Sequence, residues 1–483
     1  MKYLSPERIG LFLGPAFFIC ILLLANPDGL SSAGVAVLAS TAWIAIWWIT
    51  EALPISVTAL LPIVLFPLTG ALDLTATTAA FGHKYIFLYI GGFLLAIAIE
   101  RWNLHRRIAL IIINLIGAGI SKIILGFMLA TAFLSMWISN TATTVMMLPI
   151  GMAIISQLTD HPDTPEDENS IFGKALMLAI AYAASIGGIA TLIGTPPNLV
   201  LAGVVHENYG IEISFAQWFK FGFPISIIML FIAWYYLTKI RFKFKFDAFP
   251  GGQTEIKRLL NQLGKIGHEE KLVLFVFIIT AVAWISRSIL QKYIPAIDDT
   301  IIAMIAGISL FLIPTKNKTR KVLTWEEAVK LPWGILLLFG GGMALAAGFK
   351  ESGLALWLGS QMTSLAGLPL LLLLFILITC VNFLTEITSN LATTAMLLPI
   401  LAAMAITIGV HPYYLLVAAT VAASCAFMLP VATPPNAVVF GSGYLKIPDM
   451  VKTGIWLNLI SILILSLFVY FVLPRLWVLK DLQ

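Results

Sequence analysis

Long apolar segments follow one another along almost the whole chain, separated by short polar connections. They lie near residues 10–25, 33–50, 54–72, 85–100, 123–158, 174–205 and 215–238, and again near 271–290, 298–314, 332–350, 367–406, 411–445 and 453–476. Lipid offers no hydrogen bonds to the backbone, so apolar segments of this length are predicted to be helices rather than strands of a barrel. The pattern predicts an all-α polytopic membrane protein.

Four of these segments are interrupted by polar residues. Segments 123–158 and 367–406 are too long for one crossing of about 20 residues, and we interpret each as a re-entrant hairpin. Segments 174–205 and 411–445 each contain Thr-Pro-Pro-Asn. Because proline removes a helical hydrogen bond, we interpret these two as broken helices with an unwound centre. The result is about 11 transmembrane helices plus two re-entrant hairpins.

Basic residues near the ends of the spans predict the orientation of the chain. We interpret the apolar run that follows Lys2 and Arg8 as the first transmembrane helix, not as a signal peptide. Counting crossings from there places the amino terminus in the cytoplasm and the carboxyl terminus outside, with the protein in the plasma (inner) membrane. The same count places three basic clusters on the cytoplasmic side, as the positive-inside rule expects. They are Arg101, Arg106, Arg107 and Lys122; Lys239, Arg241, Lys243 and Lys245; and Lys316, Lys318, Arg320 and Lys321.

The sequence contains an internal repeat. Residues 139–150 read SNTATTVMMLPI and residues 389–400 read SNLATTAMLLPI, while Thr-Pro-Pro-Asn occurs at 195–198 and at 433–436. We predict a first helix outside the repeat (1–32), repeat 1 (33–240), a cytoplasmic linker (241–270) and repeat 2 (271–476). Each repeat has five predicted crossings, so the second enters the membrane from the opposite side. An inverted repeat with broken helices is typical of a secondary transporter.

Composition excludes several classes of protein. The 483 residues are 60% hydrophobic and only 11% charged, with a net charge of +5, whereas soluble proteins carry about 25% charged residues. A soluble enzyme, a nucleic-acid binder and a disordered scaffold are therefore excluded, and the lipid bilayer is an expected partner. The three cysteines, Cys20, Cys380 and Cys425, lie in apolar runs and do not suggest a disulfide framework.

Polar residues gather at the four interruptions. The clusters are Ser139-Asn140-Thr141, Ser389-Asn390, Thr195-Pro196-Pro197-Asn198 and Thr433-Pro434-Pro435-Asn436. The amino-terminal end of a half-helix attracts anions, and Ser, Thr, Asn and freed carbonyl oxygens suit alkali cations. Small polar residues can also simply pack helices together. Because four clusters occupy symmetrically placed breaks, we favour a binding site.

Titratable groups are scarce in the same segments. Glu386 is the only acidic or basic residue well inside a hairpin or broken helix, and its repeat counterpart is Met136. We favour a structural carboxylate bonded to the neighbouring backbone over a proton relay. No zinc-binding His-Glu pattern or nucleophile–base arrangement is present, so we predict no enzyme, no catalytic residues and no cofactor other than sodium as coupling ion.

At these residues the sequence resembles the divalent anion/sodium symporter family, whose members carry dicarboxylates, citrate or sulfate. The two Ser-Asn motifs, the paired Thr-Pro-Pro-Asn segments and Trp-Ile-Thr-Glu-Ala-Leu-Pro at 48–54 carry the resemblance. It implies a homodimer with an elevator-like mechanism. It also implies a scaffold of the first four and the seventh to ninth spans, against which the hairpins and the other spans move.

The resemblance implies the binding residues as well. One sodium ion would be bound near Ser135, Ser139, Asn140 and Gly194, and a second near Thr385, Thr388, Asn390 and Ala432. The substrate would contact Asn140, Thr141, Thr195, Ser389, Asn390, Thr433 and Pro434. Leu391 stands where the family often has Thr, so it either faces the substrate or points into helix packing.

Taken together, these features predict a symporter that moves a small divalent organic anion into the cell, with a C4-dicarboxylate such as succinate as substrate. A proton-coupled carrier or an anion exchanger for dicarboxylate, citrate or sulfate is the alternative among carriers. An anion channel is a third alternative, although a channel does not need paired cation sites.

Overall fold

The computed structural model describes residues 5–117, 119–156, 168–244, 252–362 and 367–477. Within these residues the regular structure is helical, and the only β contact is an isolated bridge between Pro314 and Lys321. Eight of the described helices are long and apolar enough to cross a membrane, and six further apolar helices are shorter. The prediction of an all-α polytopic membrane protein is confirmed.

The first half of the chain runs from α1 through the first broken helix to the helix that follows it. In order they are α1 (Pro6–Leu24), α2 (Ser32–Thr50), α3 (Ile55–Thr58), α4 (Leu61–Thr69), α5 (Leu74–Ala79), η1 (Ala80–Gly82), α6 (Lys84–Arg101), α7 (Leu104–Ile116), α8 (Ile120–Ser135), α9 (Asn140–Ile155), α10 (Glu168–Ile189), α11 (Pro196–Tyr209), α12 (Phe215–Tyr235) and η2 (Tyr236–Arg241).

The second half begins with a helix inside the segment 241–270, which the sequence presented as a linker. In order its elements are α13 (Gly252–Gln262), α14 (His268–Ile285), α15 (Arg287–Leu290), α16 (Asp299–Leu312), α17 (Trp325–Ala328), α18 (Trp333–Glu351), α19 (Leu354–Gln361), α20 (Leu370–Thr385), α21 (Asn390–Thr407), α22 (Pro412–Ala423), α23 (Pro434–Phe440), α24 (Ile447–Phe471) and α25 (Leu473–Trp477).

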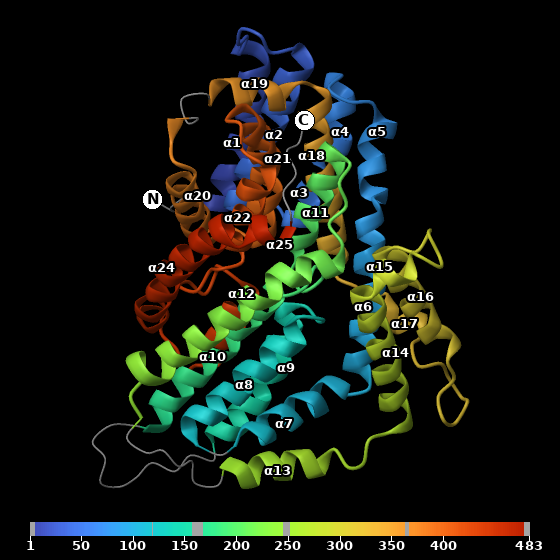
Figure 1. Cartoon of the computed structure of the whole chain (residues 1–483). Helices are drawn as coiled ribbons and strands as arrows, with labels where there is room; N and C mark the ends of the chain where they lie inside the picture. The colour runs from blue at the N-terminus through green and yellow to red at the C-terminus, as the bar shows by residue number, and fades with distance from the viewer. Residues whose placement is uncertain (1–4, 118, 157–167, 245–251, 363–366, 478–483) are drawn as a thin grey trace.

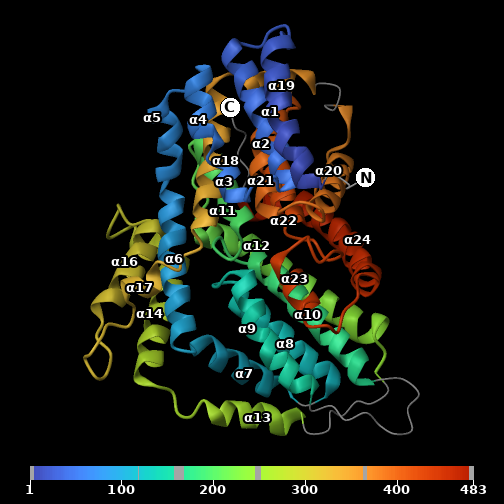
Figure 2. The ribbon, with the colours of Figure 1, turned by 180° about the vertical axis from the view of Figure 1, so that it is seen from behind.

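The two helical hairpins lie at opposite ends of the molecule. In Figures 1 and 2, α8 and α9 lie beside α7 and α10 at one end, and α20 and α21 lie beside α1, α2 and α19 at the other. Helix α10 packs against α8, α9, α12 and α23, while α22 packs against α11, α20, α21 and α24. The interruptions of both broken helices lie between the two hairpins, where the hairpin tips approach each other.

Short four-residue links form the hairpin tips. Helix α8 ends at Ser135, and α9 begins at Asn140 after Ser139, whose hydroxyl accepts a hydrogen bond from Ala142 N at 3.3 Å. This is the usual way in which a serine satisfies a free N–H at a helix start. The second hairpin has a link of the same length between Thr385 and Asn390, but the Ser389 side chain there makes no capping hydrogen bond.

An asparagine holds each broken helix at its interruption. The Asn198 amide donates to the carbonyls of Thr191 at 2.8 Å and Gly188 at 3.2 Å. The Asn436 amide donates to the carbonyls of Leu429 at 3.0 Å and of Ala426 at 3.3 Å, which are the same seven and ten residues earlier. These bonds satisfy carbonyls that the unwound stretch leaves without helical partners. The Asn of each Thr-Pro-Pro-Asn thus fixes the shape of the break.

Packing contacts repeat between the two halves of the chain. A Cβ placed on Gly91 would lie 2.5 Å from the backbone of Ala303, and one placed on Gly341 would lie 2.3 Å from that of Ala59. Glycine therefore lets α6 approach α16, and lets α18 approach the end of α3, at backbone distance. The two halves are built on the same packing scheme.

The close contact at Gly91 generates a stability prediction with its neighbour as control. Gly91→Ala should lower the midpoint of thermal unfolding in detergent, because overpacking against a backbone costs about 1–3 kcal/mol. Gly92→Ala should unfold near the wild-type temperature, since its Cβ would meet Ile193 at an ordinary 3.5 Å. Equal midpoints for the two variants would contradict the close approach of α6 and α16.

Candidate functional site

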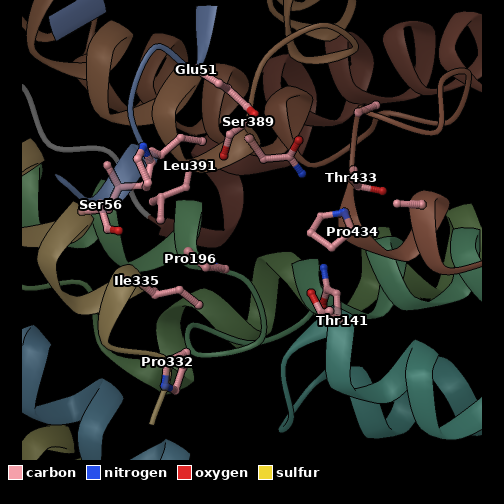
Figure 3. Close-up of a pocket in the computed structure, with 18 of the residues that line it drawn as sticks. Glu51, Ser56, Thr141, Pro196, Pro332, Ile335, Ser389, Leu391, Thr433 and Pro434 are labelled. Atoms are coloured by element: carbon pink, nitrogen blue, oxygen red, sulfur yellow. The ribbon is translucent and has the colours of Figure 1, made fainter. Parts of the chain in front are cut away.

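A cavity of about 970 Å³ lies where the hairpin tips meet the two broken helices (Figure 3). All seven residues that the resemblance assigned to substrate line it: Asn140, Thr141, Thr195, Ser389, Asn390, Thr433 and Pro434. They come from four segments that are far apart in the sequence. The structure therefore brings the four polar interruptions together at one place.

The opposite wall of the cavity comes from parts of the chain that the sequence analysis did not assign to the site. It includes residues 51–56, which connect α2 to α3, and part of 332–338 at the start of α18. Figure 3 shows Ser56, Pro332 and Ile335 across the cavity from Thr433 and Pro434. The motif at 48–54 overlaps this wall, so it was the feature of the sequence that could have predicted these residues to lie at the site.

Four helices begin at the cavity. Helices α9, α21 and α11 are 16, 18 and 14 residues long, and the short α23 begins at the second Thr-Pro-Pro-Asn. Helix starts present free N–H groups and a partial positive charge. No basic side chain occurs among the described residues that line the cavity, and its charged side chains are Glu7 and Glu51. Positive potential at the tips therefore comes from backbone.

Oxygen atoms converge behind the tip of the first hairpin. One terminal atom of the Asn140 amide lies 2.6 Å from Ser135 Oγ and 3.2 Å from the carbonyl oxygens of both Ala184 and Gly194. An amide nitrogen at this position donates to all three oxygens. An amide oxygen at the same position completes a set of four oxygens, which is the kind of ligand set that hard cations prefer.

The second hairpin contains a matching arrangement. The Thr385 hydroxyl lies 2.8 Å from Asn390 Oδ1 and donates to the Ala423 carbonyl at 3.0 Å. Thr385 corresponds to Ser135, and Asn390 to Asn140. The pseudo-symmetry of the two halves therefore extends to these oxygen clusters.

The remaining residues that the resemblance assigned to sodium lie close to the clusters but make other contacts. Ser139 caps α9, and the Thr388 hydroxyl bonds to the Leu384 carbonyl at 2.9 Å and to Thr393 Oγ1 at 2.6 Å. Ala432 lines the cavity and is buried. Ala184 and Ala423 were missed, because a backbone carbonyl ligand leaves no trace in side-chain chemistry.

Gly188 supports the first cluster, and the sequence analysis did not name it. A Cβ at this position would lie 2.5 Å from Asn140 Oδ1 and 3.0 Å from its Nδ2. Any larger residue at 188 would therefore push the Asn140 amide away from Ala184 and Gly194.

Glu386 is a structural carboxylate in this structure. It is 3% exposed, and it accepts hydrogen bonds from the backbone N–H groups of Phe427, Met428 and Leu429 at 2.8–3.0 Å and from Asn458 Nδ2 at 2.7 Å. Four N–H donors thus converge on the two carboxyl oxygens of Glu386. Glu386 thus ties the second hairpin to the unwound stretch that precedes α23.

Leu391 is largely packed away from the cavity. It is 6% exposed, although it contributes to the cavity wall. Its counterpart Thr141 is exposed at the matching tip. The two hairpin tips therefore present different surfaces to whatever binds between them.

The fold and the cavity define a multi-pass membrane transport protein. The transmembrane-region model of the sodium:sulfate symporters matches residues 6–477. The chain therefore belongs to the sodium:sulfate symporter family, the divalent anion/sodium symporters that its motifs predicted. The prediction of a transporter rather than an enzyme is confirmed.

Curated relatives cover almost the whole chain. The sodium-dependent dicarboxylate transporter SdcS of Staphylococcus saprophyticus is 50% identical over 480 residues, which are 98% of this chain and 92% of that protein. SdcS of Staphylococcus aureus strain USA300 is 52% identical over 477 residues, covering 97% of this chain and 92% of that protein.

Two solved structures share the fold. The Alcanivorax borkumensis YdaH transporter has a TM-score of 0.60 at 14% identity, covering 91% of this chain and 99% of that one. Neisseria gonorrhoeae MtrF, which belongs to a class of antimetabolite efflux pumps, has a TM-score of 0.56 at 13% identity, covering 97% of this chain and 95% of that one. At these identities the likeness concerns the fold alone.

The contact between Gly188 and Asn140 generates a prediction for cation binding at the first cluster. Gly188→Ala should raise the sodium concentration that stabilises the purified protein against heating, by roughly tenfold if displacing the amide costs about 1–3 kcal/mol. Gly82→Ala is the control, since a Cβ there would meet no atom within 4 Å. A Gly188→Ala protein with the wild-type sodium response would exclude the cluster as a sodium site.

Proposed function

We propose that this protein imports a C4-dicarboxylate such as succinate together with sodium ions, as a homodimer in the plasma membrane. The dicarboxylate and the sodium are supported by the names of the SdcS relatives, which are about half identical to this chain. The cavity supports the same proposal independently through its chemistry. The homodimer rests on the family resemblance.

The observation that carries the proposal is a cavity with helix starts and no lining basic side chain. A dianion that leaves water needs its charge offset, because an unpaired buried charge is very costly. Helix starts supply partial charges, each equivalent to roughly half an elementary charge. Sodium ions bound at the Ser135–Asn140 and Thr385–Asn390 clusters would supply the rest. This arrangement makes anion binding depend on the cations.

The same observation favours sodium over protons as the coupling ion. Proton-coupled carriers need titratable groups near the substrate. Glu386 is occupied by backbone donors, and Glu7 and Glu51 lie on segments other than the hairpin tips. Hydroxyl, amide and carbonyl oxygens at the tips do not titrate near neutral pH. An exchanger or a channel would not require two such clusters.

We further propose an elevator-like movement in which the hairpins, broken helices, α12 and α24 shift against the scaffold. The scaffold then comprises α1–α6 and α14–α18. The cavity lies between these two parts, with residues 51–56 of the scaffold facing the hairpin tips. The positive-inside pattern of the basic residues supports a cytoplasmic location for the connection between the second and third spans, and with it a cavity that opens toward the cytoplasm.

Uptake into proteoliposomes tests the proposal. An inward sodium gradient should drive accumulation of radiolabelled succinate, whereas potassium or proton gradients imposed separately should have little effect. Unlabelled malate, fumarate, citrate and sulfate as competitors would define the substrate class. Accumulation that follows the proton gradient, or exchange that needs internal anion and no sodium, would replace this proposal with one of the alternative carriers.

The two asparagines at the hairpin tips generate a mutational prediction. Asn140→Ala and Asn390→Ala should each reduce uptake at limiting sodium and succinate at least about tenfold, because a hydrogen bond to a charged group is worth about 1.5–3 kcal/mol. Asn208→Ala is the matched control, since its amide donates to Val204 O within α11, away from the cavity. Wild-type uptake by both tip variants would place the site elsewhere.

A further inference from the structure

An ion-pair network closes one side of the molecule. Glu212, in the connection between α11 and α12, lies 2.8 Å from Arg287 Nη1 and 3.4 Å from Lys84 Nζ. Arg287 also pairs with Asp299 at 3.1 Å, and Asp299 accepts a hydrogen bond from Phe215 N at 2.7 Å. The network therefore joins α11 and α12 to α6, α15 and α16.

Aromatic packing accompanies the network. Trp137, at the tip of the first hairpin, stacks on Trp284 of α14 with ring centroids 6.4 Å apart, and Phe215 stacks on the same indole at 4.9 Å. Phe215 and Trp284 are fully buried. The first hairpin tip and the start of α12 are thus sealed against the scaffold helix α14.

The scaffold residues of this closed contact, Trp284 and Arg287, have counterparts in repeat 1. Trp48-Ile-Thr-Glu51 at the end of α2 matches Trp284-Ile-Ser-Arg287 at the end of α14. The Trp48 indole donates to the carbonyl of Ile55 at the start of α3, and the Trp284 indole donates to that of Asp299 at the start of α16. Glu51 therefore occupies the position that Arg287 occupies in repeat 2, with the opposite charge.

The part of the contact proposed to move, the connection before α12, has a counterpart before α24. A Cβ on Gly222 of α12 would meet Ile189 O, and one on Gly454 of α24 would meet Phe427 O, so the two helices pack in equivalent register. This register aligns the connection 210–214 with residues 442–446. The first contains one charged residue, Glu212, and the second contains one, Lys446. The signs are again reversed, and the two charges lie in corresponding connections, with Lys446 two residues closer to its helix start than Glu212.

Unlike Arg287 and Glu212, Glu51 and Lys446 are apart in this structure. Glu51 and Lys446 are both exposed, and neither forms an ion pair within the described residues. Glu51 ends α2 at φ 49°, a left-handed geometry that favours Gly or Asn at a helix end. A carboxylate does not stabilise the carboxyl-terminal end of a helix, so we expect the Glu51 side chain to have another role.

Apolar residues on the same side are also uncovered. Val431 and Ile447 are 78% and 51% exposed, whereas their counterparts Ile193 and Phe215 are 8% and 0% exposed. Ile387, the counterpart of Trp137, is 62% exposed. The apolar residues that are buried around Trp284 thus have exposed counterparts around Glu51.

We infer that Glu51 and Lys446 form an ion pair in the alternative transport state, as the charge-reversed counterpart of the Arg287–Glu212 pair. The inference rests on the proposed alternating-access function, in which the two repeats exchange conformations. Closure on the Glu51 side would bring the connection 441–446 against the end of α2. The Arg287–Glu212 network opens in that state, so each pair stabilises one of the two end states.

Charge reversal tests the pairing. Glu51→Lys and Lys446→Glu should each slow sodium-driven uptake roughly threefold to tenfold, since a like-charge contact replaces a favourable pair in one end state. The double variant should recover most of the lost rate. Glu51→Lys combined with Lys452→Glu, an exposed lysine farther along α24, is the matched control and should not recover. Equal recovery by both doubles, or none by the first, would overturn the pairing.

Cross-linking tests the geometry without relying on transport rate. Cysteines at 51 and 446 would be introduced after replacement of Cys20, Cys380 and Cys425, with sodium-driven uptake of that background measured first. A short bifunctional thiol reagent should join them weakly when Arg287 is present, and more strongly when Arg287→Glu releases the opposite pair. An unchanged yield would overturn the inference. Absence of sodium-driven uptake by the unmodified protein would instead refute the proposed function.

Discussion

A divalent anion cannot enter the interior of a membrane protein unless its two charges are offset there. In the function proposed for this chain, that constraint would be met without a basic side chain lining the described cavity. Helices α9, α11 and α21 turn their amino-terminal ends toward one point, and oxygen clusters at Ser135–Asn140 and Thr385–Asn390 lie behind the hairpin tips. The partial charges point into the cavity only while the helix breaks keep their shape. The Asn198 and Asn436 amides stabilise that shape through their bonds to backbone carbonyls.

Duplication of the motif links binding to movement. Contacts such as Gly91 with Ala303 and Gly341 with Ala59 show that both repeats use the same packing. In the proposed transport cycle, two such repeats in opposite orientation would each adopt the arrangement that the other has, which would give a carrier two end states of similar energy. Interactions that differ between the repeats then set the balance. Arg287 with Glu212 is closed in this structure, whereas Glu51 and Lys446 stand apart on the open side.

The sequence predicted the helical fold and the residues that meet in the cavity, because polar residues inside apolar segments are costly and hence informative. Asn140, Thr195, Asn390 and Thr433 all line one cavity. It did not reveal Ala184, Ala423 or Gly188, which act through a carbonyl or through the absence of a side chain. Nor did it reveal the cavity wall at 51–56, since long-range packing decides what faces a tip. Whether Leu391 contacts substrate could not be decided from the sequence, and the structure buries it almost entirely.

Cation-dependent anion affinity is the central claim, and equilibrium binding measures it without transport. Succinate affinity of the purified protein would be determined by calorimetry at a series of sodium concentrations, with choline maintaining ionic strength. If two sodium ions bind with the anion, the logarithm of the affinity should rise with the logarithm of sodium concentration, with a slope approaching about two below saturation. Succinate affinity that is the same in sodium and in choline would contradict the account, because the anion's charge would then be offset by groups that do not include sodium.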